Sequence, residues 1–230
     1  MKISYKTYFN ERLKQVSFHG QLTHPLYIQV TYNRKPIYFK SYYFELFSKP
    51  RYLLNLGNHL PLAPTLDHVI TLEVETLAHI LAKHSHDFSL SLFKSAYEYY
   101  SRDLCDVTEA GFISYLRDFL IDEGLPALGQ TLANGTQGIV AYDLVDEFKR
   151  ILPQAQFSKL VNHSVTYGTP YLFIYGFMRQ VKRWPNLILT PKDLTQRETL
   201  NAFADFLLES YPGIETHAVL DQIGNWSSYL

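Results

Sequence analysis

Cysteine and long apolar runs are scarce in this sequence. Its 230 residues include a single cysteine, Cys105, which excludes a disulfide within the chain. No apolar run approaches the roughly 18 residues needed to span a bilayer. The opening residues, MKISYKTYFNERLK, lack the continuous apolar core of a signal peptide. We therefore expect a cytoplasmic protein with no membrane partner, and the single cysteine is compatible with a reducing compartment.

Motifs that carry chemistry are also missing. The Gly-rich segment 124–138 lacks the lysine and hydroxyl of a phosphate-binding loop, and we interpret it as an interhelical segment with room for one helical turn. His79, His84 and His86 are spaced H-x4-H-x-H, which does not align metal ligands on one helix face. Cys105 lies near an apolar stripe, where a small core residue is the commoner role. The sequence thus predicts no catalytic residue, metal or cofactor, although the fold alone could still assemble a hydrolase-type site.

Aromatic residues, by contrast, are abundant. Hydrophobic residues make up 47% of the chain and aromatic residues 15%, including 18 Tyr and 15 Phe. A chain of this length can form one large domain or two unequal ones, with a core that needs no disulfide or metal. Charged residues, at 19%, fall below the usual quarter, and this composition is typical of a folded protein.

The net charge of −1 conceals a strong asymmetry along the chain. Residues 1–51 contain nine Lys or Arg but only Glu11 and Glu45 as acidic residues, which gives +7. The remaining 12 basic and 20 acidic residues give −8. Such a split favours a basic N-terminal module that meets an anionic partner. The alternative is that the two parts neutralise each other by packing together.

A β-hairpin is predicted at 24–44, HPLYIQVTYNRKPIYFKSYYF. Apolar and polar residues alternate on both sides of a central turn, as in half-buried strands. Asn33 tolerates the left-handed backbone of a tight turn, and Pro36 suits the start of a return strand at a sheet edge. The apolar face would carry Leu26, Ile28, Val30, Ile37 and Phe39. The opposite face would carry Tyr27, Gln29, Thr31, Tyr38, Lys40 and Tyr42, with Arg34 and Lys35 at the tip.

The rest of the chain changes from strand to helix periodicity. Strands at 2–9 and 13–19 would complete an antiparallel sheet of three or four strands. A connector that contains three prolines and one glycine follows at 48–64. Capping residues and apolar stripes then predict helices at 65–83, 89–104, 108–124, 141–152, 154–162, 170–183, 190–211 and 215–223. We predict an α+β protein with a basic antiparallel sheet module at 1–50 and a helical domain at 65–230.

The basic, aromatic sheet is the best candidate for a functional surface. Lys and Arg neutralise phosphates, and Tyr hydrogen-bonds the backbone or stacks on bases. The candidate DNA- or RNA-binding residues are Lys6, Arg12, Lys14, Arg34, Lys35 and Lys40, together with Tyr27, Tyr38 and Tyr42. Two alternatives remain open: an ordinary solvated sheet face, and a protein-binding face in a subunit of a phage, secretion or defence assembly.

The run LYIQVTYNRKPIYFKSYYF resembles the N-terminal arm-type DNA-binding domain of tyrosine recombinases, the phage-integrase-like proteins of bacterial mobile elements. The resemblance covers about residues 2–46, and the helices from 65 to 152 would take the place of that family's core-binding domain. The family's catalytic domain requires a His-x-x-Arg box, and none of the nine histidines here is followed by Arg at the third position. The resemblance therefore implies DNA binding without recombination, in an accessory or regulatory factor of a mobile element.

Overall fold

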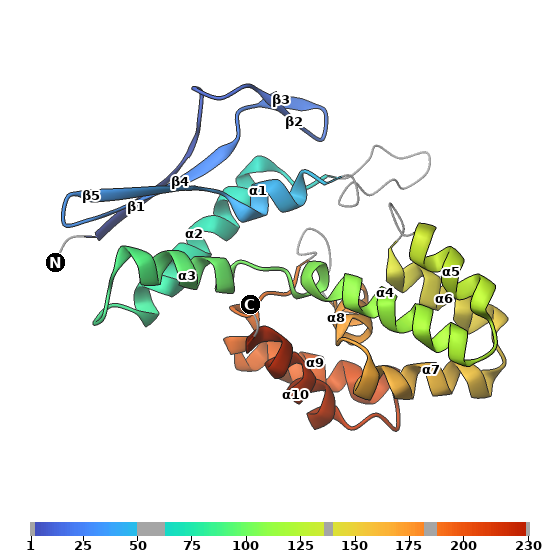
Figure 1. Cartoon of the computed structure of the whole chain (residues 1–230). Coiled ribbons are helices and arrows are strands. Elements are labelled where there is room, and N and C mark those ends of the chain that lie inside the picture. Colours follow the sequence, from blue (N-terminus) through green and yellow to red (C-terminus); the bar gives the residue numbers. More distant parts are fainter. Residues whose placement is uncertain (1–2, 50–62, 136–139, 182–187, 229–230) are drawn as a thin grey trace. The chain divides into compact units, whose positions relative to one another are not determined.

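The computed structural model describes residues 3–49, 63–135, 140–181 and 188–228 (Figure 1). Short strands come first and a long series of helices follows, which confirms the predicted α+β class. The chain divides into two compact units, Met1–Arg102 and Asp103–Leu230. This boundary differs from the predicted one between 50 and 65, because the first two long helices belong with the sheet.

The predicted hairpin is present in the first unit as two strands of a three-stranded antiparallel sheet. The strand order is β1-β4-β5, so the first strand of the hairpin is central and the return strand lies at an edge. The strand predicted at 13–19 is shorter and belongs to a separate two-stranded ribbon. There His19 and Gly20 take positive φ angles of 49° and 88°, which turns the chain back at once. The strand bounds are β1 Ile3–Phe9, β2 Val16–Phe18, β3 Gln21–Thr23, β4 Leu26–Tyr32 and β5 Lys35–Lys40.

Helices α2 (Leu66–Lys83) and α3 (Leu90–Tyr100) lie along one side of this sheet (Figure 1). Ile28 and Val30 of β4 are completely buried in one cluster with apolar side chains of both helices, including Leu77. A sheet with one apolar face needs such a cover to be stable in water. This packing explains why the compact unit extends to Arg102.

The return strand ends earlier than predicted, because Ser41 caps a helix. Its Oγ accepts a hydrogen bond from the Phe44 backbone N–H at 2.9 Å, and α1 (Tyr42–Phe47) follows. The aromatic run at 42–44 suits a strand, and the serine cap overrides that propensity. Tyr42 therefore leaves the alternation of the sheet.

A buried carboxylate joins the three helices of the first unit. Glu73 of α2 is fully buried, and its Oε1 accepts hydrogen bonds from Ser41 Oγ at 2.5 Å, Tyr97 Oη at 2.8 Å and the Tyr43 backbone N–H at 3.3 Å. The hydroxyl of Tyr97 in turn accepts from the Tyr42 backbone N–H at 2.9 Å. Burial, with the nearby Glu73 charge, raises the pKa of Tyr97. The end of the sheet is thereby fixed to α2 and α3.

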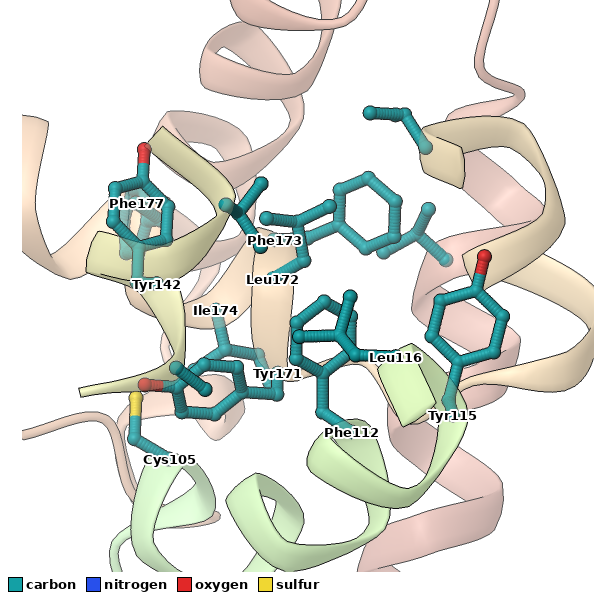
Figure 2. Packing of buried hydrophobic residues seen from close by; sticks show 14 of the residues in the cluster. Cys105, Phe112, Tyr115, Leu116, Tyr142, Tyr171, Leu172, Phe173, Ile174 and Phe177 are labelled. Atoms are coloured by element: carbon teal, nitrogen blue, oxygen red, sulfur yellow. The ribbon is translucent and has the colours of Figure 1, made fainter. Parts of the chain in front are cut away.

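The described residues of the second unit form helices and connecting loops, with no strand among them. Its central helix α8 has seven buried residues and packs between α4, α6 and α9 (Figure 2). Gly176 permits this close packing, since a Cβ there would lie 3.0 Å from the ring of Phe206. The helix bounds are α4 Leu104–Asp122, α5 Pro126–Gly135, α6 Ala141–Ile151, α7 Gln154–Tyr167, α8 Tyr171–Gln180, the 3-10 helix η2 Asp193–Thr195, α9 Arg197–Ser210 and α10 Thr216–Ser228.

Several helix boundaries in this unit differ from the predictions, and α7 and α10, for example, each extend five residues beyond the predicted ends at 162 and 223. α4 begins at Leu104 instead of 108, because Asp103 Oδ1 accepts from the Cys105 N–H at 3.1 Å and caps it. The Gly-rich segment at 124–138 holds a full helix, α5. The predicted helix start at Thr190 leads only to the short helix η2, where the backbone N–H groups of Thr190 and Asp193 each donate to the other residue's side chain. Gln196 then has an extended backbone, so α9 begins only at Arg197. No helix in the described residues is long and apolar enough to cross a membrane.

Replacing Glu73 tests the buried carboxylate. Glu73→Ala should lower the free energy of unfolding by about 3 kcal/mol or more, because three donors lose their acceptor inside the core. Glu73→Gln keeps an acceptor oxygen and should cost less. Glu98→Ala on the solvent side of α3 serves as the control and should change stability by less than about 0.5 kcal/mol in urea unfolding. Equal losses for the two alanine variants would contradict a special role for Glu73.

Candidate functional site

The face of the main sheet opposite α2 and α3 carries four of the nine candidate residues, Lys6, Tyr27, Tyr38 and Lys40. The register of the strands sets the residues of this face in three rows from β1 through β4 to β5. We call these nine residues the open face: Ser4, Thr31 and Pro36 in the first row, Lys6, Gln29 and Tyr38 in the second, and Tyr8, Tyr27 and Lys40 in the third. None of the nine is acidic, and the predicted separation into an apolar and a polar face is confirmed.

The six candidate cations fall into three groups, all solvent-exposed. Lys6 and Lys40 lie on the open face, on the two edge strands. Arg34 and Lys35 lie at the hairpin tip, as predicted. Arg12 and Lys14 lie in the loop between β1 and β2, away from the paired strands. The structure thus brings Lys6 and Lys40 onto one surface with the tyrosines and leaves the other four around it.

Two of the three candidate tyrosines lie on the open face, and the third lies outside it. Tyr27 and Tyr38 are on the open face, and Tyr38 is 56% exposed. Tyr42 is on α1, where its partly buried side chain packs against the cluster beneath the sheet. Tyr8, which was not selected from the sequence, joins the face instead, and its ring centroid lies 6.3 Å from that of Tyr27. Its spacing of two residues from Lys6 puts both side chains on the same face of β1, but only the pairing of β1 with β4 places that face beside Tyr27.

Lys40 already has an anionic neighbour. Its Nζ lies 3.0 Å from Oε1 of Glu45 on α1, and each side chain is 57% exposed. The hydrogen bond from Lys40 to Glu45 raises the pKa of the lysine. Exposed pairs of this kind contribute only about 0–1 kcal/mol, so a phosphate could displace Glu45. On the other edge strand, Lys6 Nζ lies 5.5 Å from the centroid of the Tyr8 ring.

At the hairpin tip, Arg34 has a strained backbone conformation. Asn33 and Arg34 have φ angles of 48° and 66°, which is the pattern of a two-residue type I′ turn. Asn tolerates the left-handed region, but an arginine there costs about 1 kcal/mol or more compared with glycine. Strained residues of this kind often lie at functional sites. The turn therefore presents the Arg34 side chain at the end of the sheet, at some expense in stability.

The other candidates from the sequence take structural positions. The His79 ring packs edge-on against Tyr100, with centroids 4.8 Å apart, and His84 ends α2. Cys105 is buried in the core of the second unit, as expected of a small core residue. In the part of the chain that the structure describes, no group of three or more His, Cys, Asp or Glu residues could hold a metal ion.

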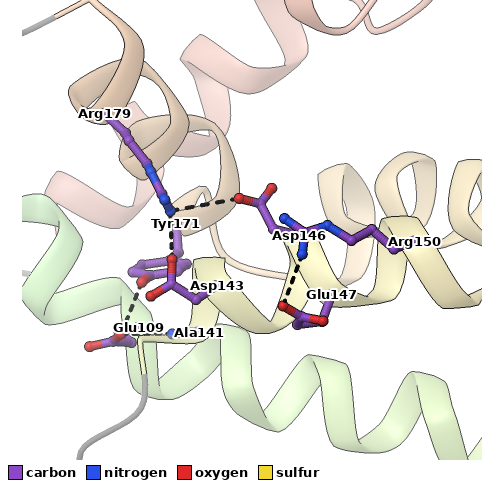
Figure 3. Close-up of polar contacts among 8 residues, drawn as sticks. All are labelled: Glu109, Ala141, Asp143, Asp146, Glu147, Arg150, Tyr171 and Arg179. Atoms are coloured by element: carbon purple, nitrogen blue, oxygen red, sulfur yellow. Dashed lines mark hydrogen bonds and ion pairs between the residues drawn. The ribbon is translucent and has the colours of Figure 1, made fainter. Parts of the chain in front are cut away.

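The second unit has a cavity of about 620 Å³ lined by α6, α7 and α8 and the segment after α9. Of its lining cations, Lys149 and Arg179, the second is already bound by carboxylates: Nη1 lies 2.5 Å from Asp143 and 3.6 Å from Asp146 (Figure 3). Nearby, Glu109 accepts a hydrogen bond from the Tyr171 hydroxyl at 2.9 Å, and burial raises the pKa of that tyrosine. These contacts join α4, α6 and α8, so we interpret them as structural.

Substitution at the tip measures the strain on the turn. Arg34→Gly should raise the free energy of unfolding by about 0.5–1 kcal/mol, because glycine adopts positive φ without a steric penalty. Lys35→Gly, one residue later in β5, should have the opposite sign, since glycine weakens a strand. Urea unfolding of the two variants would measure both effects. A loss of stability for Arg34→Gly would exclude the strained turn.

Comparisons with known proteins identify no relative of this chain. No protein-family model matches it. Neither the curated proteins nor the solved structures gave a match. The case for a function therefore depends on the residues of the open face and their surroundings.

Proposed function

We propose that this protein binds nucleic acid through the open face of its N-terminal sheet. The observation that supports the proposal is the composition of that face: two lysines and three tyrosines among nine residues, with no acidic one. Phosphates attract the lysines, and tyrosines contact bases or sugar-phosphate groups. Arg34 and Lys35 extend the basic surface beyond the end of the strands.

The narrower form of the proposal is a DNA-binding accessory or regulatory factor of a mobile element. It is supported by the resemblance of the hairpin to arm-type domains and by a strand, a tight turn and a basic return strand in that order. It assigns no catalytic role to the chain. The bound nucleic acid would be held chiefly by charge, so affinity would fall steeply with salt.

A protein-binding face is the second candidate, and the exposure of Tyr38 favours it specifically. Tyrosine is enriched at protein interfaces because its ring is apolar and its hydroxyl polar. Such an interface would be dominated by aromatic burial, so its affinity would respond little to salt. The same titration in salt therefore separates the two candidates.

The first test is binding of a labelled nucleic acid as a function of salt. If four cations contact phosphates, affinity should fall roughly a hundredfold between 50 and 200 mM salt. The double variant Arg34→Glu, Lys35→Glu should weaken binding to every sequence and reduce the magnitude of the salt slope by about two. Fluorescence anisotropy measures both quantities.

Lys94→Glu provides the matched control for charge reversal. Lys94 is exposed on α3, which covers the opposite face of the sheet. Its Nζ lies 3.8 Å from Oε1 of Glu98, an exposed ion pair comparable with Lys40–Glu45. This variant should bind nearly as well as the natural chain. Absence of any DNA or RNA binding at low salt would refute the proposed function.

The pair Lys40–Glu45 gives a test in the opposite direction. Glu45→Gln removes the competing carboxylate, so Lys40 becomes available to a phosphate and affinity should rise about two- to fivefold at low salt. Glu98→Gln, which releases Lys94 on α3, should leave affinity within twofold. Equal gains for both variants would show that only net charge matters and that Lys40 has no special position.

A further inference from the structure

The three tyrosines of the open face occupy neighbouring positions across the sheet and form a band of rings, one on each strand. Tyr8 on β1 lies directly opposite Tyr27 on β4, and their ring centroids are 6.3 Å apart. Tyr27 is in turn the diagonal neighbour of Tyr38 on β5, since Tyr27 pairs with Lys40 and Tyr38 with Gln29. Diagonal neighbours lie about 7–8 Å apart, within reach of aromatic rings. Every strand of the sheet thus contributes one ring.

The two lysines of the face lie on either side of this band. Lys6 is next to Tyr8 along β1, and Lys40 is next to Tyr38 along β5. The cations are therefore at opposite edges, with aromatic rings between them. A strand of nucleic acid crossing the face could place its bases on the rings while phosphates at each edge meet a lysine.

The only amide of this face, Gln29, already donates from Nε2 to Thr31 Oγ1 at 3.3 Å. In a duplex the flat faces of paired bases are covered by their neighbours, so only base edges and the backbone are accessible to a protein. Rings can stack only on bases that are unpaired.

We infer that the open face binds single-stranded nucleic acid, with unpaired bases stacked on Tyr8, Tyr27 and Tyr38 and the backbone held by Lys6 and Lys40. This inference rests on the proposed function and specifies its partner. Stacking makes sequence preference weak, since every base has an aromatic face. It also assigns a role to Tyr8, which charge alone does not.

The experiment compares strands of equal sequence at one low salt concentration. Labelled single-stranded DNA of about 15 nucleotides, the same sequence as RNA, and the corresponding DNA duplex are titrated with the 230-residue chain. The single strands should bind at least about tenfold more tightly than the duplex. Tighter binding of the duplex would overturn the inference and leave the proposed function intact. Failure of all three to bind would overturn the proposed function itself.

Variants of Tyr38 test stacking separately from charge. Tyr38→Thr keeps a strand-forming residue but removes the ring, and it should weaken single-strand binding roughly fivefold to a hundredfold while duplex binding changes little. Tyr38→Phe and Tyr38→Trp keep a ring and should restore the affinity. Tyr167→Thr removes a tyrosine that is 73% exposed on α7 of the other unit and should have no effect. Unfolding curves of the variants confirm that each one folds.

Tyr38→Trp also gives a direct signal of stacking. The first unit has no tryptophan of its own, because both tryptophans of the chain, Trp184 and Trp226, lie in the second unit. Single-stranded DNA should quench the emission of the variant beyond the change seen in the natural chain. Binding without additional quenching, or equal effects of Tyr38→Thr on single strand and duplex, would overturn the inference.

Discussion

The burial of one face of the β1-β4-β5 sheet is the constraint on which the first unit depends. Ile28 and Val30 have no exposed surface, and each requires an apolar cover from α2 and α3. Glu73 then fixes the end of the sheet to those helices through three hydrogen bonds. The apolar face of a sheet must be buried against another element, and here the two helices supply that cover while the carboxylate fixes their attachment.

The same constraint determines what the other face can do. A slip of one residue would exchange the two faces, because side chains alternate along a strand. Core burial therefore fixes the positions of Lys6, Tyr8, Tyr27, Tyr38 and Lys40 although these residues contribute little to the core. The face is consequently a rigid surface, and rigid binding surfaces lose less entropy when a partner docks.

Much of this surface could be predicted because alternation is a local property. The assignment of Tyr27, Tyr38 and Lys40 to one face needed only the period of two. Tyr42 leaves that face because Ser41 caps a helix. The prediction gave more weight to the strand propensity of three successive aromatic residues than to this local cap. Tyr8 required the pairing of β1 with β4, which a single sequence does not reveal. The unit boundary after Arg102 likewise depends on packing between distant segments.

The charge asymmetry persists, somewhat reduced, when the chain is divided at the unit boundary. Residues 1–102 hold 12 basic and seven acidic residues, a net charge of +5, and residues 103–230 hold nine basic and 15 acidic residues, a net charge of −6. An acidic helical unit on average repels a phosphate backbone. Under the proposed function, the free energy of binding would therefore come chiefly from the first unit, where the open face combines cations with exposed aromatic rings. Aromatic stacking gains importance in this arrangement, because a net charge near zero for the whole chain offers a nucleic acid little long-range attraction.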